Sequence, residues 1–199
     1  MKFKTLLLSL LVGFFLFQSF TNLPENFTGK FEKKSIYDFK VKDINGKTFD
    51  FETLKGKKIM VVNTASQCML ANQQFAELEK LYQQYRNDNF VIVAFPSSDF
   101  MDCEVASNEE IKNTYDKNFN ISFPLMSKVS VKGTDSHELF KFLTDKRQNK
   151  VKGCGVLWNF QKFLINENGE LEKIVNPKVS PSDNEVTSWI SKQKSIVAN

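Results

Sequence analysis

The sequence is poor in the residues from which metal sites and disulfide frameworks are built. Its 199 residues include three cysteines and one histidine, His137. Three thiols cannot all pair within one chain, so a disulfide framework is excluded and at least one thiol is free, reactive or paired elsewhere. Cys68 has no partner at C-x-x-C spacing, which argues against a thioredoxin-type disulfide oxidoreductase. His137 falls in an apolar helical pattern, and no haem or nucleotide motif is found, so we expect no metal and no cofactor.

A strong excess of one charge is also missing. The chain has 27 Lys and Arg against 23 Asp and Glu, a formal net charge of +4. A nucleic-acid surface needs clustered basic residues, so we expect no nucleic-acid partner. With 41% hydrophobic and 25% charged residues, the composition is that of a globule with a real core, and the length favours one domain.

The N-terminus contains an uncharged apolar run, Leu6 to Phe17, after a basic start with Lys2 and Lys4. A membrane-spanning helix needs roughly 17–25 such residues, so this run better fits the hydrophobic region of a secretory signal. We expect residues 1–20 to be a signal peptide or an uncleaved anchor, and the protein to be periplasmic or secreted. Residues 21–34 read as a polar linker, and residues 35–195 as the folded domain.

The remaining chain alternates between strand and helix patterns. Two hairpins are predicted around Asn-Gly turns, because this dipeptide is the strongest short hairpin signal. Continuous apolar runs indicate strands covered on both faces, and apolar residues at helical spacing indicate amphipathic helices. The predicted elements are hairpins at 35–54 and 162–175, strands at 57–63 and 90–95, and helices at 72–86, 108–118, 137–143 and 183–192. This order predicts an α/β fold with a central mixed sheet, flanking helices and an N-terminal β-hairpin.

Cys68 lies where the first apolar run ends and a helical pattern begins. Open α/β sheets place their sites at the carboxyl ends of strands, and a helix N-terminus favours a thiolate. The helix dipole contributes only about 0.3–1 kcal/mol, so a strong nucleophile would need further hydrogen-bond donors. A buried, inert cysteine is the alternative interpretation.

Three motifs in order carry a family resemblance: NTASQC at 63–68, FPSSDF at 95–100, and Trp158-Asn159-Phe160 before the last hairpin. Over about residues 35–190 the chain resembles the glutathione peroxidase family, in its cysteine-type, monomeric, phospholipid-hydroperoxide-like form, on a thioredoxin-like fold. The resemblance implies that Cys68 reduces hydroperoxides with support from Trp158 and Asn159. It also implies a sulfenic acid intermediate and a thiol reductant, either a thioredoxin-like protein or glutathione.

Asp99 departs from the family pattern, because it stands where the family has a catalytic glutamine. An ionised carboxylate about 4 Å from a thiolate costs about 4 kcal/mol at an effective dielectric of 20, which exceeds the helix dipole. Asp99 must therefore be protonated, turned away, or part of a weakened site, and we expect it to be ionised and to face Cys68. A redox sensor or binding module with a weakened site is the alternative function.

The second departure concerns the thiol that resolves the sulfenic acid. Thioredoxin-dependent members carry it in the helix near Asp116, where this chain has no cysteine. Cys103 and Cys154 are the available thiols, and we rank Cys154 slightly higher because it lies four residues before Trp158. An external thiol remains an equal alternative. The short segment from Leu143 to Trp158 lacks the insertion of tetrameric members, so a monomer that accepts bulky lipid hydroperoxides is expected.

Overall fold

The computed structural model describes residues 34–192; the predicted signal peptide or anchor and all of the linker except Lys34 lie outside that range. Its helices and strands occur in the predicted order. They are η2 (Ile36–Asp38), β1 (Lys40–Lys42), β2 (Thr48–Asp50), η3 (Phe51–Leu54), β3 (Lys58–Thr64), α2 (Ala71–Tyr85), β4 (Phe90–Pro96), α3 (Asn108–Asn118), α4 (Glu138–Thr144), α5 (Lys146–Asn149), β5 (Lys162–Ile165), β6 (Leu171–Val175) and α6 (Asn184–Ser191).

The central sheet has the strand order β4-β3-β5-β6. β3 and β4 are parallel, with α2 as the crossover between them, whereas β5 is antiparallel to both β3 and β6. In this register Val62 lies opposite Lys162, so the carboxyl end of β3 meets the amino end of β5. The predicted mixed sheet is therefore confirmed, and three of its strands bring their adjoining loops to one edge.

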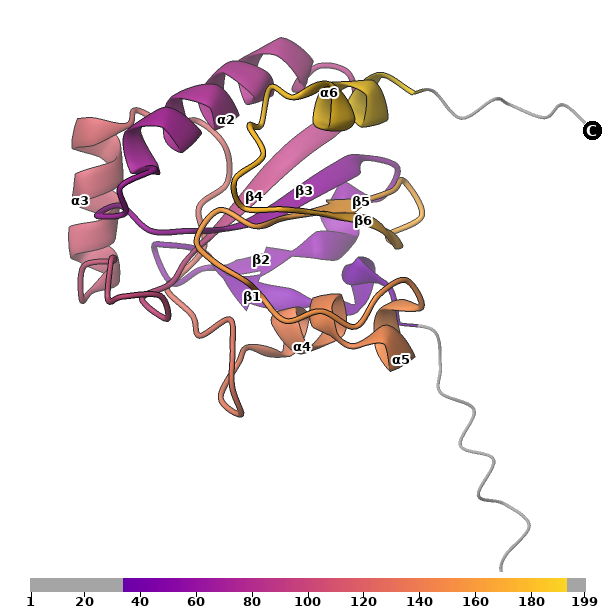
Figure 1. Cartoon of the computed structure of the whole chain (residues 1–199), viewed down its shortest axis with the longest axis horizontal. Coiled ribbons are helices and arrows are strands. Elements are labelled where there is room, and N and C mark those ends of the chain that lie inside the picture. Colours follow the sequence, from indigo (N-terminus) through magenta and orange to yellow (C-terminus); the bar gives the residue numbers. More distant parts are fainter. Residues whose placement is uncertain (1–33, 193–199) are drawn as a thin grey trace, which may run out of the picture. The chain divides into compact units, whose positions relative to one another are not determined.

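The two central strands bury both of their faces. In β3, Ile59 and Val61 belong to one apolar core, whereas Met60 and Val62 belong to the other. This alternation follows from the period of two in a strand. Helices α2, α3 and α6 contribute to the second core, and α4 to the first together with the β1–β2 hairpin. Helices therefore cover both faces of the sheet, as Figure 1 shows.

The structure is more irregular than the sequence pattern at the N-terminal hairpin. β1 and β2 have three residues each, and their predicted extensions form the 3-10 helices η2 and η3. Side-chain caps explain both helices, since the Ser35 and Asp50 side chains accept bonds from nearby backbone N–H groups. Gly46, with a φ of 77°, forms the predicted tight turn.

His137 also has a structural role that the helical pattern only partly predicts. It precedes α4 as its N-cap, and its Nδ1 accepts a bond from Leu139 N–H at 3.2 Å. The four-residue helix α5, which follows α4 directly, has no counterpart in the sequence prediction.

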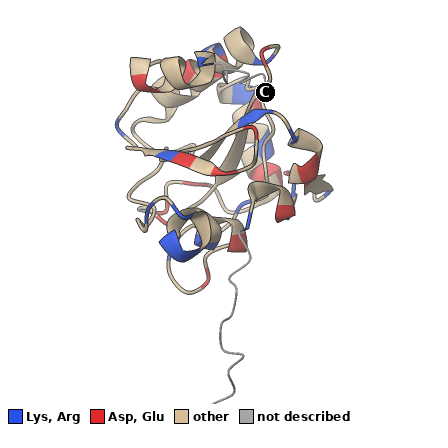
Figure 2. Cartoon of the chain, turned by 90° about the vertical axis from the view of Figure 1, so that its right-hand side faces the viewer, with Lys and Arg blue, Asp and Glu red and all other residues tan. Residues whose placement is uncertain are grey.

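The charged residues are of both signs over the face seen in Figure 2, where Lys and Arg are interspersed with Asp and Glu on helices and strands. In residues 34–192, no helix has the length and apolar character needed to cross a membrane.

Candidate active site

Three loops meet at the sheet edge where β3 and β4 end and β5 begins. They are residues 65–70 between β3 and α2, residues 97–107 between β4 and α3, and residues 153–161 before β5. The first contains Cys68, the second Asp99 and Cys103, and the third Cys154, Trp158 and Asn159. The residues singled out in the sequence therefore all belong to the three loops that reach this edge.

Cys68 is a free thiol that is 9% exposed, between the end of β3 and the start of α2. Its backbone closes a turn: its N–H donates to Ala65 O at 3.4 Å, and its carbonyl accepts from Ala71 N–H at 2.8 Å. The side chain belongs to the apolar core beneath α2, with Phe75 and Phe160. The thiol is thus close to the helix N-terminus but shielded on its inner side by hydrocarbon.

Trp158 and Asn159 are fixed to the end of β3 by Asn63. The Asn63 amide donates to Trp158 O at 3.1 Å, and Asn63 O accepts from Phe160 N–H at 2.7 Å. The Trp158 side chain is 38% exposed, and its ring lies 5.3 Å from that of Phe100. The Trp158 segment therefore lies beside the carboxyl end of β3, from which the Cys68 loop leaves.

Asn159 is fully buried, and neither atom of its amide has a hydrogen-bond partner in the described part of the chain. Buried polar groups are nearly always paired, so an unpaired amide indicates strain or a function. Within residues 34–192, no hydrogen bond joins Cys68 to Trp158, Asn159 or Asp99. The structure thus collects these segments without linking their side chains to the sulfur.

Asp99 does not follow the expectation that it faces Cys68. Its Oδ2 accepts bonds from Ser130 Oγ at 2.9 Å, Val131 N–H at 2.6 Å and Lys132 N–H at 3.1 Å. Asp99 therefore has three hydrogen-bond donors that do not include the thiol. These bonds hold Oδ2 toward residues 130–132, which corresponds to the turned-away arrangement among the three considered.

Glu104 is a buried residue of the site that the sequence analysis does not identify. Its carboxylate accepts from Ser66 N–H at 3.1 Å, from the Ser66 hydroxyl, from Tyr115 O–H at 2.7 Å and from its neighbour Val105 N–H at 3.0 Å. Burial, and then the nearby charge of Glu104, raises the pKa of Tyr115 well above its ordinary value. Glu104 therefore joins the Cys103 loop to the Cys68 loop and to α3. An acidic residue in a polar loop gives no sequence signal for such a role.

Cys103 lies directly against the Cys68 loop. Its carbonyl accepts from Gln67 N–H at 2.8 Å, and its side chain packs against the same apolar core as Cys68. Burial, and then the neighbouring Cys68, raises the pKa of the Cys103 thiol.

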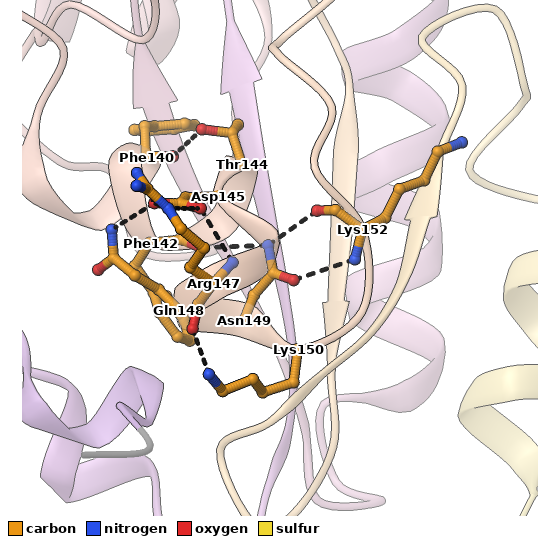
Figure 3. A network of polar contacts seen from close by, with 9 residues as sticks. All are labelled: Phe140, Phe142, Thr144, Asp145, Arg147, Gln148, Asn149, Lys150 and Lys152. Atoms are coloured by element: carbon orange, nitrogen blue, oxygen red, sulfur yellow. Dashed lines mark hydrogen bonds and ion pairs between the residues drawn. The ribbon is translucent and has the colours of Figure 1, made fainter. Parts of the chain in front are cut away.

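Cys154 belongs to the opposite side of the sheet. Its N–H donates to Thr144 O at 3.1 Å, at the end of α4, and α4 packs into the other apolar core. The preceding turn is held there too, because Asn149 binds Phe142 O at 3.3 Å and Lys152 O and N–H at 3.0 Å each (Figure 3). The nearness of Cys154 to Trp158 in sequence therefore does not carry its thiol toward Cys68.

Large exposed apolar side chains surround the thiol loops. Among the described residues these are Met69, Met101, Val151, Leu157 and Trp158, with Met69 97% exposed. Four of the five belong to the three loops of the site. Exposed apolar groups that gather at one place indicate contact with an apolar ligand or surface.

A cavity of about 660 Å³ lies elsewhere, lined by residues that include Lys58, Tyr85, Glu167 and Ile190. These residues mark the amino ends of β3 and β4, at the edge of the sheet opposite Cys68. In residues 34–192, no group of three His, Cys, Asp or Glu side chains is arranged to hold a metal ion.

Comparison with known proteins identifies similar chains. A family model described as glutathione peroxidase matches residues 36–144. The chain is 36% identical over 160 residues to the glutathione peroxidase-like peroxiredoxin 2 of Saccharomyces cerevisiae, covering 79% of this chain and 98% of that protein. It is 38% identical over 151 residues to a probable phospholipid hydroperoxide glutathione peroxidase of Mesembryanthemum crystallinum, covering 76% and 88%.

The fold has a wider distribution. A crystal structure of a thiol:disulfide interchange protein of the thioredoxin family, from Chlorobium tepidum, matches with a TM-score of 0.58. It covers 76% of this chain and 92% of the other at 19% identity, a level that speaks for the fold alone. The predicted thioredoxin-like fold is confirmed.

Proposed function

Because the chain belongs to the glutathione peroxidase family and is a thiol peroxidase, we propose that Cys68 is the residue that reduces the hydroperoxide. The supporting observation is its place: of the three thiols, Cys68 alone lies between the carboxyl end of β3 and the N-terminus of α2. The thiolate attacks the terminal peroxide oxygen, the alcohol or water leaves, and Cys68 becomes a sulfenic acid.

Trp158 and Asn159 assist this step as donors. The indole N–H can only donate, so it can stabilise a thiolate without competing for its proton. The unpaired amide of the buried Asn159 offers two N–H donors that no described residue occupies. A rotation that brings this amide toward the sulfur or the leaving oxygen would satisfy it and lower the barrier, as preorganised donors do.

The assignment is tested by rapid mixing of the reduced protein with one equivalent of hydrogen peroxide. Cys68→Ser should abolish the fast first turnover, whereas Cys154→Ser, a matched control on the other side of the sheet, should retain it. A first-turnover rate in Cys68→Ser equal to that of the parent would overturn the assignment. Thiol loss in the parent no faster than for free cysteine would favour the sensor or binding module.

The substrates include organic and lipid hydroperoxides as well as hydrogen peroxide. The apolar residues around the thiol loops support this, since they offer contact to a hydrocarbon chain and not to hydrogen peroxide. Met69→Lys and Leu157→Lys should raise the KM for a phospholipid hydroperoxide severalfold and leave that for hydrogen peroxide unchanged. Equal effects on both substrates would refute the apolar contact.

The oxidised enzyme is returned to the thiol form by a thioredoxin-like protein or glutathione, and the protein acts in the response to oxidative stress as a monomer. The short connection between α4 and β5, which consists of α5 and one loop, supports the monomer. Turnover with each reductant and size-exclusion chromatography test these statements. Dependence of activity on a dimer would contradict the proposed monomer.

Export is proposed from the basic start and the Leu6 to Phe17 run, which lie outside the described residues. A reporter fused after Asn22 should leave the bacterial cytoplasm, and Leu8→Asp with Leu11→Asp should keep it inside. Retention of the unmodified fusion would refute export.

A further inference from the structure

We propose that Cys103 is the resolving thiol, which attacks the sulfenic acid of Cys68 and closes a disulfide between the β3–α2 and β4–α3 loops. This inference rests on the proposed role of Cys68 and adds the second reacting residue. It reverses the ranking from the sequence, in which Cys154 stood slightly higher.

The backbone brings the two thiols together. The bond from Gln67 N–H to Cys103 O, at 2.8 Å, places Cys103 beside the residue that precedes Cys68. Consecutive Cα atoms are about 3.8 Å apart, so Cys68 is one step from this contact. Both side chains face one apolar core. A disulfide needs Cα atoms about 4.4–6.8 Å apart, a separation that a small movement of an exposed loop can supply.

Glu104 holds this arrangement. Its carboxylate, buried to 5% exposure, binds both the N–H and the hydroxyl of Ser66, two residues before Cys68. The loop contains two residues in an unfavourable backbone conformation, since Met101 and Asp102 have φ values of 58° and 47°. Left-handed conformations are unfavourable for residues other than glycine. The contacts of Glu104 and Cys103 with the Cys68 loop offset that cost.

The electrostatics suit the order of events. In the reduced enzyme a thiolate at Cys68 opposes ionisation of Cys103, whose pKa is raised by burial and by Cys68. Once Cys68 has become a neutral sulfenic acid, that opposition ends and Cys103 ionises more readily. Oxidation of Cys68 therefore removes one cause of the raised pKa of Cys103, whereas burial, the larger cause, remains.

The two steps balance as follows. The Cys68 thiolate, a hydroperoxide and one proton give the Cys68 sulfenic acid and an alcohol. The Cys103 sulfur then attacks the Cys68 sulfur, the S–O bond breaks, and the hydroxyl leaves as water with the Cys103 proton. Two external thiols reduce the resulting disulfide by exchange and are themselves oxidised to a disulfide.

Peptide mapping can read the pairing directly, because trypsin places the three cysteines on separate peptides, 59–80, 87–112 and 153–162. The full reduced chain is treated with one equivalent of cumene hydroperoxide, alkylated and digested. We expect peptide 59–80 joined to peptide 87–112 in the parent and in Cys154→Ser. In Cys103→Ser we expect no joined peptide and a Cys68 sulfenic acid that dimedone traps. Joining of peptide 59–80 to peptide 153–162, or no joined peptide despite a trapped sulfenic acid in the parent, would overturn the proposal.

A second experiment without peroxide distinguishes failure of the proposed role of Cys68 from failure of the proposed Cys68–Cys103 pairing. The protein is equilibrated with mixtures of reduced and oxidised dithiothreitol, and the same peptides are mapped. A Cys68–Cys103 disulfide here, together with inertness toward peroxide, would refute the role of Cys68 but keep the pairing. Its absence here and in the peroxide arm would refute the pairing itself.

Glu104 is a positioning residue in this proposal, and Glu104→Gln tests it. The amide keeps the shape but weakens charge-assisted hydrogen bonds, so disulfide closure should slow by about tenfold. The rate of sulfenic acid formation in the Cys103→Ser background should stay within about twofold, since Glu104 does not contact the Cys68 sulfur. A general loss of structure would slow both steps equally, and such an outcome would refute a positioning role.

Discussion

Lys162, at the start of β5, should make the stability of the enzyme depend on pH in an unusual window. The residue is fully buried, and its Nζ donates to the carbonyls of Pro177 at 3.2 Å and Val179 at 2.7 Å. Burial lowers the pKa of Lys162 from 10.5 to about 7, against a smaller opposing effect of Glu77. No carboxylate in the described residues forms an ion pair with it.

The direction in which the free energy of unfolding changes with pH follows from the number of protons that each state binds. Between pH 7 and pH 10.5 the unfolded chain keeps the Lys162 proton and the folded chain loses it. The free energy of unfolding therefore rises with pH, by at most about 1.4 kcal/mol per pH unit. Over the whole window the gain is on the order of 5 kcal/mol, an upper value because the two carbonyls favour the charged form. Below pH 7 both states are protonated, and the cost of the buried charge is fully present.

The assay compares urea unfolding of the parent and of Lys162→Met from pH 6.5 to pH 10. Thiols and tyrosines titrate in both proteins, so they cancel in the difference. We expect the parent to gain about 1 kcal/mol per pH unit over the variant between pH 7.5 and pH 9.5. The ¹³Cε shift of Lys162 in the folded protein should titrate near pH 7. Parallel stability curves, or a midpoint above pH 9, would refute the reasoning.

Two further predictions concern Asp99 and His137. Asp99→Asn keeps an acceptor for the 130–132 backbone but loses the charge, so unfolding should become easier by about 1–3 kcal/mol, with the first-turnover rate changed less than about threefold; a rise above about tenfold would show that the carboxylate acts on Cys68 after all. Burial lowers the pKa of His137, so stability present above pH 6.5 should be lost as the unfolded chain takes up the proton at lower pH. His137→Asn, which keeps the cap without titrating, should remove this acid loss in thermal unfolding from pH 7 to pH 5, and an unchanged loss would contradict the assignment.

The fold could be predicted from the sequence wherever the local residue pattern and the burial of the element agree. The apolar runs of β3 and β4 are continuous because both faces are covered, and the spacing in α2 reports its single buried face. The hairpin predicted at 35–54 was less regular, since side-chain caps at Ser35 and Asp50 compete locally with strand pairing. Such competition is decided by a few hydrogen bonds that periodicity does not register.

The site could be only partly predicted from the sequence, because its decisive contacts join residues far apart in the chain. The direction of Asp99 is set by N–H groups at 131 and 132, more than thirty residues away. The place of Cys103 is set by Gln67 and by the bond of Glu104 to Ser66. A motif can assign Cys68 a role from its neighbours in sequence, but the partner of Cys68 depends on which loop is folded over it.

Asp99 and Glu104 both anchor the β4–α3 loop to neighbouring segments. Each carboxylate accepts backbone N–H groups from a different neighbouring segment, Asp99 from residues 131 and 132 and Glu104 from Ser66. The four-residue stretch between them, 100–103, is therefore fixed at both ends, and its middle residues, the left-handed Met101 and Asp102, are exposed. Cys103 lies in that stretch, so it can move toward Cys68 while the loop keeps its anchors. A carboxylate in place of an amide at position 99 then strengthens an anchor, because its hydrogen bonds to backbone N–H groups are charge-assisted.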